Sequence, residues 1–178
     1  WDMAQERVRR VVTAVLADDC GAAASGFVPF ACEVEAKGTL PDGTVGMTVS
    51  MRGRLDRVDR HPVSGVVRVI DYKYRANSRV EAKDRNLLQA AIRAHRLQPA
   101  LYALMTLAEP LDGARHALPE RVEFVYLLPQ GEPAVDRASF DSSAWQGPSG
   151  PLLSRAVQTL LNGIREGRHF IVPDETHC

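Results

Sequence analysis

Two aspartates and a lysine stand at spacings that could support metal-assisted hydrolysis. Asp56 lies in one polar segment, and Asp71 and Lys73 lie two positions apart in a later one. Residues two apart on a strand point to one face. Paired carboxylates suit a hard cation such as Mg²⁺, which takes oxygen ligands. With an amine beside them, they could polarise a phosphodiester, activate a water and stabilise a pentavalent transition state.

A β-hairpin is the element that must bring these side chains together. Residues 45–60 alternate apolar and polar side chains, which is the period of a half-buried strand. Turn-forming residues fill positions 61–65, and residues 66–74 form the second expected strand. On that second strand we expect Asp71 and Lys73 to share a face with the valines at 67 and 69.

The expected hairpin register places the two aspartates against each other. If the turn is centred between Val63 and Ser64, Asp56 pairs with Asp71, with Cβ atoms about 4.5–5.5 Å apart. Facing carboxylates repel, so either a bound cation joins them, or a surface ladder of ion pairs with nearby arginines and Lys73 offsets them. The chain has 22 Lys and Arg residues, of which three are lysines. Because lysine is rare here and is a compact charge whose pKa can shift, a lysine inside this strand favours a specific role.

The rest of the chain supplies a sheet and its flanking helices. Besides the hairpin, periodicity predicts strands at 27–37, 121–128 and 132–141, and helices at 2–17, 82–108 and 152–166. Small and turn-forming residues predict loops at 18–26, 38–46 and 142–151. Pro99 either kinks the long helix or lies in the first turn of a second one. The order of elements predicts an α/β or α+β domain, a mixed central sheet flanked by helices.

Length and composition favour one ordinary globular domain over residues 1–178. The chain is 45% hydrophobic and 25% charged, which is typical of soluble domains. Since it begins at Trp1 and ends at Cys178, we expect a piece of a longer protein. Three scattered cysteines do not make a disulfide framework and favour a reducing compartment, the cytoplasm. No signal peptide or long apolar run predicts secretion or membrane insertion.

Charge is distributed unevenly along the chain. The formal net charge is zero, yet residues 52–96 hold twelve Lys or Arg and five Asp or Glu. This segment could follow a phosphate backbone. The alternative is a solvated charged face without a partner.

The two polar segments resemble a known family of nucleases. Residues 53–59, Gly-Arg-Leu-Asp-Arg-Val-Asp, followed by residues 70–73, Ile-Asp-Tyr-Lys, resemble the RecB-type nucleases of the PD-(D/E)XK superfamily, in particular the RecB and AddB helicase–nuclease subunits. The resemblance implies a restriction-endonuclease-like core and an exonuclease that cleaves DNA with Mg²⁺ or Mn²⁺. It also implies single-stranded DNA and a helicase as partners, in DNA repair and recombination.

The resemblance also assigns roles to individual residues. It makes Asp56 and Asp71 metal ligands, Tyr72 a ligand through its backbone carbonyl, and Lys73 the catalytic lysine. A glutamate of the first strand often points into the site in this family. We expect Glu33 to be that residue, although Glu35 shares its face.

Three further features concern the family pattern outside the hairpin. Gln98 and Tyr102 match its Gln-x-x-x-Tyr motif on a helix, linked to DNA binding and active-site organisation. Cys178 matches the approach to a group of cysteines that holds an iron–sulfur cluster in AddB-type nucleases. Such a cluster could form only in a longer parent protein. The helix at 2–17 carries neither the histidine nor the cysteine of many relatives, so metal ligation in this piece could be incomplete.

Two other functions compete with an active nuclease. One is a non-catalytic DNA-binding or scaffold module that kept the nuclease fold. The complete set of Asp56, Asp71 and Lys73 argues against it, since a decayed copy tends to lose one of them. The other is a hydrolase of small phosphoesters, which the basic segment and the pair Gln98 and Tyr102 disfavour.

Overall fold

A six-stranded mixed sheet forms the centre of the computed structural model, which describes residues 1–22, 26–41, 48–76, 79–108 and 118–168. The strand order is β4-β1-β2-β3-β5-β6, with β3 and β5 parallel and the other neighbours antiparallel. This is the expected mixed sheet flanked by helices. The strands are β1 (Val28–Pro41), β2 (Thr48–Arg60), β3 (Val67–Tyr74), β4 (Met105–Leu107), β5 (Arg121–Leu127) and β6 (Val135–Asp141).

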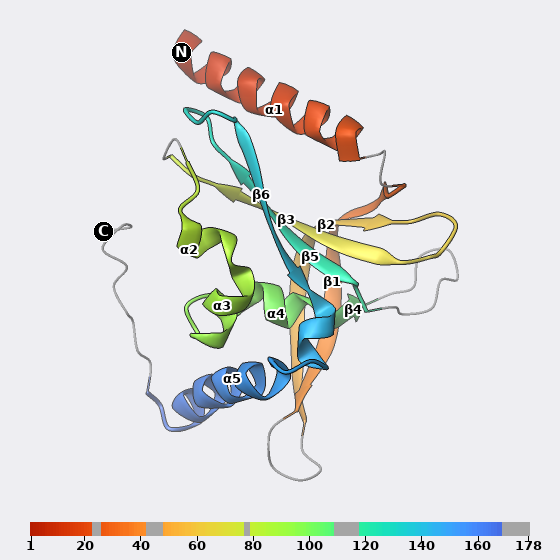
Figure 1. Ribbon diagram of the computed structural model, residues 1–178, viewed down its shortest axis with the longest axis vertical. Coiled ribbons are helices and arrows are strands. Elements are labelled where there is room, and N and C mark those ends of the chain that lie inside the picture. Colours follow the sequence, from red (N-terminus) through yellow and green to blue (C-terminus); the bar gives the residue numbers. More distant parts are fainter. Residues whose placement is uncertain (23–25, 42–47, 77–78, 109–117, 169–178) are drawn as a thin grey trace.

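Helices cover the two faces of the sheet unequally. The long helix α1 lies on one side of the sheet, and α2, α3, α4 and α5 lie on the other (Figure 1). The bounds are α1 (Asp2–Ala22), α2 (Ala82–Arg85), α3 (Leu87–Ile92), α4 (Gln98–Tyr102) and α5 (Gly150–Arg165), with a short 3-10 turn, η2 (Ser142–Trp145), before α5.

The hairpin of β2 and β3 has the predicted register over its inner part. Arg60 pairs with Val67, and the ladder continues to the pair of Arg57 and Ile70. β3 also pairs in parallel with β5, from Arg68 to Tyr74. The sheet is therefore continuous around β3, the strand that carries Asp71.

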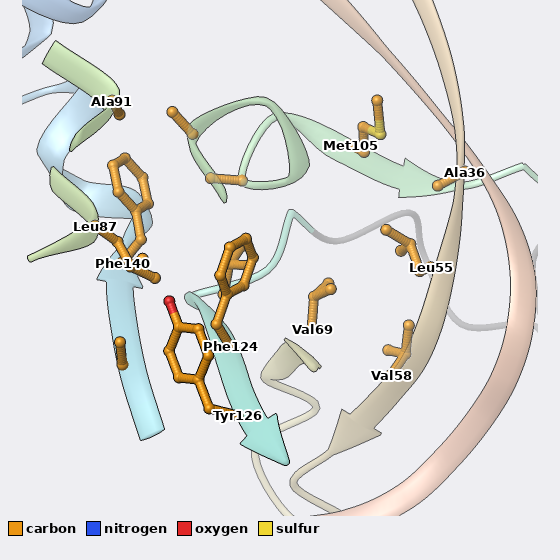
Figure 2. Close-up of a cluster of buried hydrophobic side chains, with 14 of the residues drawn as sticks. Ala36, Leu55, Val58, Val69, Leu87, Ala91, Met105, Phe124, Tyr126 and Phe140 are labelled. Carbon is orange, nitrogen blue, oxygen red and sulfur yellow. The ribbon is translucent and has the colours of Figure 1, made fainter. Parts of the chain in front are cut away.

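The main hydrophobic core lies between the sheet and helices α3 to α5. Phe124 and Tyr126 of β5 are fully buried and pack edge to face with ring centroids 6.4 Å apart. Figure 2 shows them beside Leu87 and Phe140, with Val69 of β3 next along the sheet. Asp71 and Lys73 follow Val69 on the same face of β3, so they lie at the edge of this core.

Helix α1 is longer than predicted and packs less closely than its pattern suggests. It continues to Ala22, so the predicted loop at 18–26 is wrong for its first residues. Val8, Val12 and Leu16 are 63%, 51% and 60% exposed. Polar contacts hold the helix instead: Arg10 pairs with Glu132 at one end, and two aspartates bind sheet arginines at the other.

The predicted helix at 82–108 is wrong as a single element. The segment forms three short helices and ends in β4, which pairs with β1. Pro99 lies in the first turn of α4, one of the two arrangements expected. Leu, Ala and Met favour helix intrinsically, but pairing with the edge of β1 overrides that preference at Met105–Leu107.

The remaining boundaries differ by a few residues. β1 extends past 37 to Pro41, and the predicted strand start at 45–47 lies outside the described residues. The predicted loop at 142–151 contains η2 and the start of α5. Gly167 follows α5 with a φ of 66°, the left-handed conformation that is common where a helix ends in glycine. No helix in the described ranges is long and apolar enough to span a membrane.

Candidate active site

The site lies where β2 separates from β3. The ladder between them stops at Arg57 and Ile70, while β2 continues along β1 to Thr48. Asp56 therefore does not form the predicted cross-strand pair with Asp71. Its Oδ2 instead accepts a hydrogen bond from the backbone N–H of Tyr72, at 2.9 Å.

Asp71 is the most buried acid of this site. It is 2% exposed, and its Oδ1 accepts a hydrogen bond of 2.9 Å from Nε2 of Gln98. Its Oδ2 lies 2.6 Å from Nζ of Lys73, an ion contact that lacks the direction of a hydrogen bond. Among the described residues, this buried oxygen has no hydrogen-bond partner of good geometry. Burial raises the pKa of Asp71, Lys73 lowers it, and the charge of Asp56 raises it further.

Gln98 and Tyr102, one turn apart on α4, close the site from the helical side. Besides Asp71, Nε2 of Gln98 contacts the hydroxyl of Tyr102 at 2.8 Å. That hydroxyl donates in turn to the backbone carbonyl of Arg54 in β2, at 3.2 Å. Burial raises the pKa of Tyr102, the hydrogen bond to Gln98 lowers it, and the charges of Asp71 and Asp56 raise it. The pair therefore links β2 to β3 across the gap.

Lys73 joins an acidic and an aromatic neighbour. Its side chain is 31% exposed, so the ammonium group keeps access to solvent. Nζ lies 4.9 Å from the centre of the Phe124 ring, within the range of a cation–π contact. The predicted common face of Asp71 and Lys73 is thus the edge of the hydrophobic core.

The donor set at the gap fits a hard divalent cation. The N–H of Arg75 bonds to Leu127 in β5, and successive strand residues direct their backbone groups to alternate sides. Tyr72, three residues earlier, therefore directs its N–H and C=O toward β2, beside Asp56. Two carboxylates, one of them with an unsatisfied buried oxygen, and a carbonyl are oxygen ligands of the kind Mg²⁺ takes together with water and substrate. The described residues hold no group of three or more His, Cys, Asp or Glu side chains able to bind a metal.

Glu33 is placed near this gap but directed elsewhere. The register on either side, with Cys32 opposite Arg57 and Val34 opposite Leu55, puts Glu33 across from Asp56. Its carboxylate pairs with Arg54 at 2.8 Å and is 60% exposed. Its φ of 53° is unusual for a strand residue and marks a local irregularity of β1.

The arginines that could have balanced the aspartates have other partners. Arg54 pairs with Glu33, and Arg57 pairs with Asp59 and with Asp19 of α1. Of the expected ladder, Lys73 does pair with Asp71, whereas these two arginines pair with other acids. Sequence reasoning missed the buried positions of Arg57 and Asp59, although two charges flanking a valine inside a strand, at the point where alternation fails, were a signal.

Two of the three cysteines lie in the part of the chain that the structure describes. Cys20 and Cys32 are free and exposed. Cys178, the expected cluster ligand, lies outside the described residues.

Comparison with known proteins identifies the family. No curated protein sequence matches the chain. Among solved structures, that of SSO0001 is similar, with a TM-score of 0.38 and 11% sequence identity. The match covers 85% of this chain and 57% of that one, so this chain spans just over half the length of SSO0001. The whole of residues 1–178 matches the sequence pattern of one family. The chain belongs to the PD-(D/E)XK nuclease superfamily.

Proposed function

We propose that the chain is the nuclease domain of a RecB-type, metal-dependent exonuclease that hydrolyses single-stranded DNA. The observation that carries the proposal is the environment of Asp71: a buried carboxylate with an unsatisfied oxygen, 2.6 Å from Lys73 and held by Gln98. Buried polar atoms normally have a hydrogen-bond partner, and in the described part of the chain Oδ2 of Asp71 has the ion contact with Lys73 but no hydrogen bond, which leaves it able to bind a metal. Superfamily membership supports phosphodiester hydrolysis as the chemistry.

Asp71, Asp56 and the backbone carbonyl of Tyr72 would hold one Mg²⁺ or Mn²⁺ ion. When bound, such an ion polarises a phosphoryl oxygen and lowers the pKa of a coordinated water. The protein's part is to orient both carboxylates. The hydrogen bond from Tyr72 N–H orients Asp56, and Gln98 orients Asp71.

Lys73 would act on the reacting phosphate. Its ammonium group is partly exposed, next to Asp71, so it can approach an anionic oxygen at the mouth of the site. There it would neutralise charge that develops in the transition state or orient the attacking water. The Phe124 ring beneath it limits where Nζ can move.

Other assigned residues complete the proposed site. Tyr102 would fix the position of Gln98 and the edge of β2. Glu33 is a candidate for a further ligand or base, and reaching the metal would require it to leave Arg54. Cys178 would bind an iron–sulfur cluster together with cysteines of a longer parent protein.

The same resemblance supports the proposed cellular setting. We propose that the domain is part of a larger helicase–nuclease of the cytoplasm, active in DNA repair and recombination. A helicase would deliver single strands to the gap between β2 and β3. Basic residues within 52–96 would contact the backbone of that strand.

Cleavage of labelled DNA tests the proposal. The purified chain is incubated with linear and circular single-stranded DNA and Mg²⁺, Mn²⁺ or EDTA. We expect metal-dependent shortening of the linear strand and none of the circle, and a rate about 10²–10³-fold lower for Asp71→Ala and Lys73→Ala. Matched controls are Asp141→Ala and Lys37→Ala, which remove an exposed carboxylate and an exposed amine.

Each other outcome has a distinct meaning. Equal cleavage by wild type and both site variants would reject the proposed mechanism. Binding of DNA without any cleavage would favour the non-catalytic DNA-binding module. Cleavage of the circle would replace exonuclease with endonuclease action.

A further inference from the structure

A buried arginine stands directly behind the proposed metal ligands. The guanidinium of Arg57 joins three elements: β2, α1 and β3. It donates to both carboxylate oxygens of Asp59, at 2.6 and 3.0 Å, and to Asp19 of α1 at 2.6 Å. It also donates to the hydroxyl of Tyr72 at 3.0 Å. The Arg57 side chain is 9% exposed, so these contacts replace water as its surroundings.

The charge of Arg57 is fixed by this arrangement. Burial lowers the pKa of Arg57, but its hydrogen bonds to Asp59, Asp19 and Tyr72 outweigh burial, so the pKa lies above its ordinary value. Asp59 is fully buried and is held by Arg68 as well, at 2.9 Å. The buried carboxylate of Asp59 therefore holds one edge of the Arg57 guanidinium. This restricts the position from which Arg57 contacts the Tyr72 hydroxyl.

Tyr72 connects Arg57 to the proposed metal site. It lies between Asp71 and Lys73 on β3, and its backbone N–H holds the carboxylate of Asp56. Its side chain points to the opposite face of the sheet, where Arg57 receives it. The contact with Arg57 therefore restrains, from the opposite face, the residue whose backbone bears this amide and the proposed carbonyl ligand.

We propose that Arg57 is a positioning residue for the metal centre, and that α1 sets its position through Asp19. The inference rests on the proposed function only in assuming that Asp56 and Asp71 bind a divalent ion. Partners that orient metal ligands from behind commonly change metal affinity about 10–100-fold when removed. The path Asp19–Arg57–Tyr72 therefore couples docking of α1 to metal affinity.

Two conservative substitutions interrupt this path without creating a cavity. Tyr72→Phe removes the hydroxyl that Arg57 contacts and keeps the backbone, and Asp19→Asn removes the charge that α1 offers to Arg57. Asp18→Asn is the matched control. Asp18 is the adjacent residue of α1, and its carboxylate binds Arg137, at 2.6 Å from Nε, and not Arg57. Since Arg137 also lies 3.4 Å from Asp19, Asp18→Asn controls for loss of charge pairing beneath α1 while every contact of Arg57 is kept.

Titration of Mn²⁺, followed by the electron paramagnetic resonance signal of the free ion, measures binding without catalysis. We expect Tyr72→Phe and Asp19→Asn to weaken Mn²⁺ binding about tenfold or more, and Asp18→Asn to stay within about twofold of wild type. In cleavage assays the same two variants should need about tenfold more metal for half-maximal rate, yet recover most of their rate at saturating metal. A loss of folded protein would lower the rate at every metal concentration instead.

The results separate this inference from the proposed function. Wild-type affinity in both variants, or equal weakening by Asp18→Asn, would overturn it. Absence of Mn²⁺ binding by wild type would overturn it as well. If wild type binds Mn²⁺ through this path but cleaves no DNA, the positioning role stands and the nuclease proposal falls.

Discussion

Asp71 is buried in a place where its charge is costly to the folded chain. Its side chain is 3% exposed, and burial raises its pKa, with the nearby charge of Asp56 adding to the effect. Lys73 and Gln98 offset only part of this cost. A bound divalent ion would offset the remaining cost of the Asp71 charge. In the metal-free protein this residue would therefore lower stability in exchange for function.

Asp71→Asn should therefore stabilise the metal-free protein at neutral pH. With a folded-state pKa above the ordinary value of 3.8, the folded chain binds more protons than the unfolded chain in the interval between the two values. The free energy of unfolding consequently falls as pH rises through that interval. We expect the Tm of Asp71→Asn in EDTA to exceed that of wild type at pH 7, by roughly 2–4 °C for each kcal/mol relieved.

The difference should shrink as pH falls, because the raised pKa lets the wild-type carboxyl take up its proton in the folded chain first. Added Mg²⁺ should raise the Tm of wild type but not of the variant. Scanning calorimetry at several pH values measures both effects. A variant less stable than wild type at pH 7 without metal would contradict this reading of Asp71.

Gln98 should matter through the orientation of Asp71. Gln98→Ala removes donors to both Asp71 and Tyr102. Since a hydrogen bond to a charged group contributes about 1.5–3 kcal/mol, we expect a 10–100-fold lower kcat/KM for DNA cleavage. Gln89→Ala, on an exposed glutamine of α3, is the control and should cleave normally. Equal rates for the two variants would show that Asp71 does not depend on Gln98.

At the scale of elements, local patterns predicted the hairpin well and the segment after it poorly. Alternation and the turn gave the register of β2 against β3, including the pair of Arg60 and Val67. The separation of the strands beyond Arg57 follows from pairing of β2 with β1, which no local pattern encodes. Likewise, Met105–Leu107 has a helical composition, and only its distant partner β1 makes it a strand.

Gly38 tests the importance of that β1–β4 contact. A Cβ at this position would lie 2.4 Å from the carbonyl oxygen of Leu104, a backbone atom that cannot rotate away. We expect Gly38→Ala to displace β4 and lower the free energy of unfolding by about 1–3 kcal/mol. Because Met105 packs against Gly53 beside Tyr102, cleavage should decline as well.

Gly21→Ala is the matched control, since a Cβ there meets nothing within 4 Å. It lies in α1, where alanine favours the helix, so a gain of up to about 1 kcal/mol is expected. Urea denaturation measures both variants. Equal stability of Gly38→Ala and wild type would show that β4 can shift without cost.

At the scale of the molecule, some basic side chains are buried in ion pairs and others are exposed. A count of charges along the sequence does not distinguish the two groups. Arg57 and Arg68 belong to the basic segment 52–96, yet both are buried against acids and cannot meet a phosphate. The ion pairs under α1 join residues as far apart as Asp18 and Arg137. Such pairs depend on the folded arrangement, so local sequence patterns indicated Asp56 and Asp71 as candidates but could not indicate these buried ion pairs.

The central claim is that Asp56 and Asp71 bind one divalent ion between β2 and β3. Anomalous diffraction from crystals soaked in Mn²⁺ tests it most directly. We predict one strong peak at coordination distance, about 2.1 Å, from a carboxylate oxygen of each aspartate, and its loss in Asp71→Ala. A peak elsewhere, or none at these two residues in crystals saturated with Mn²⁺, would contradict the account.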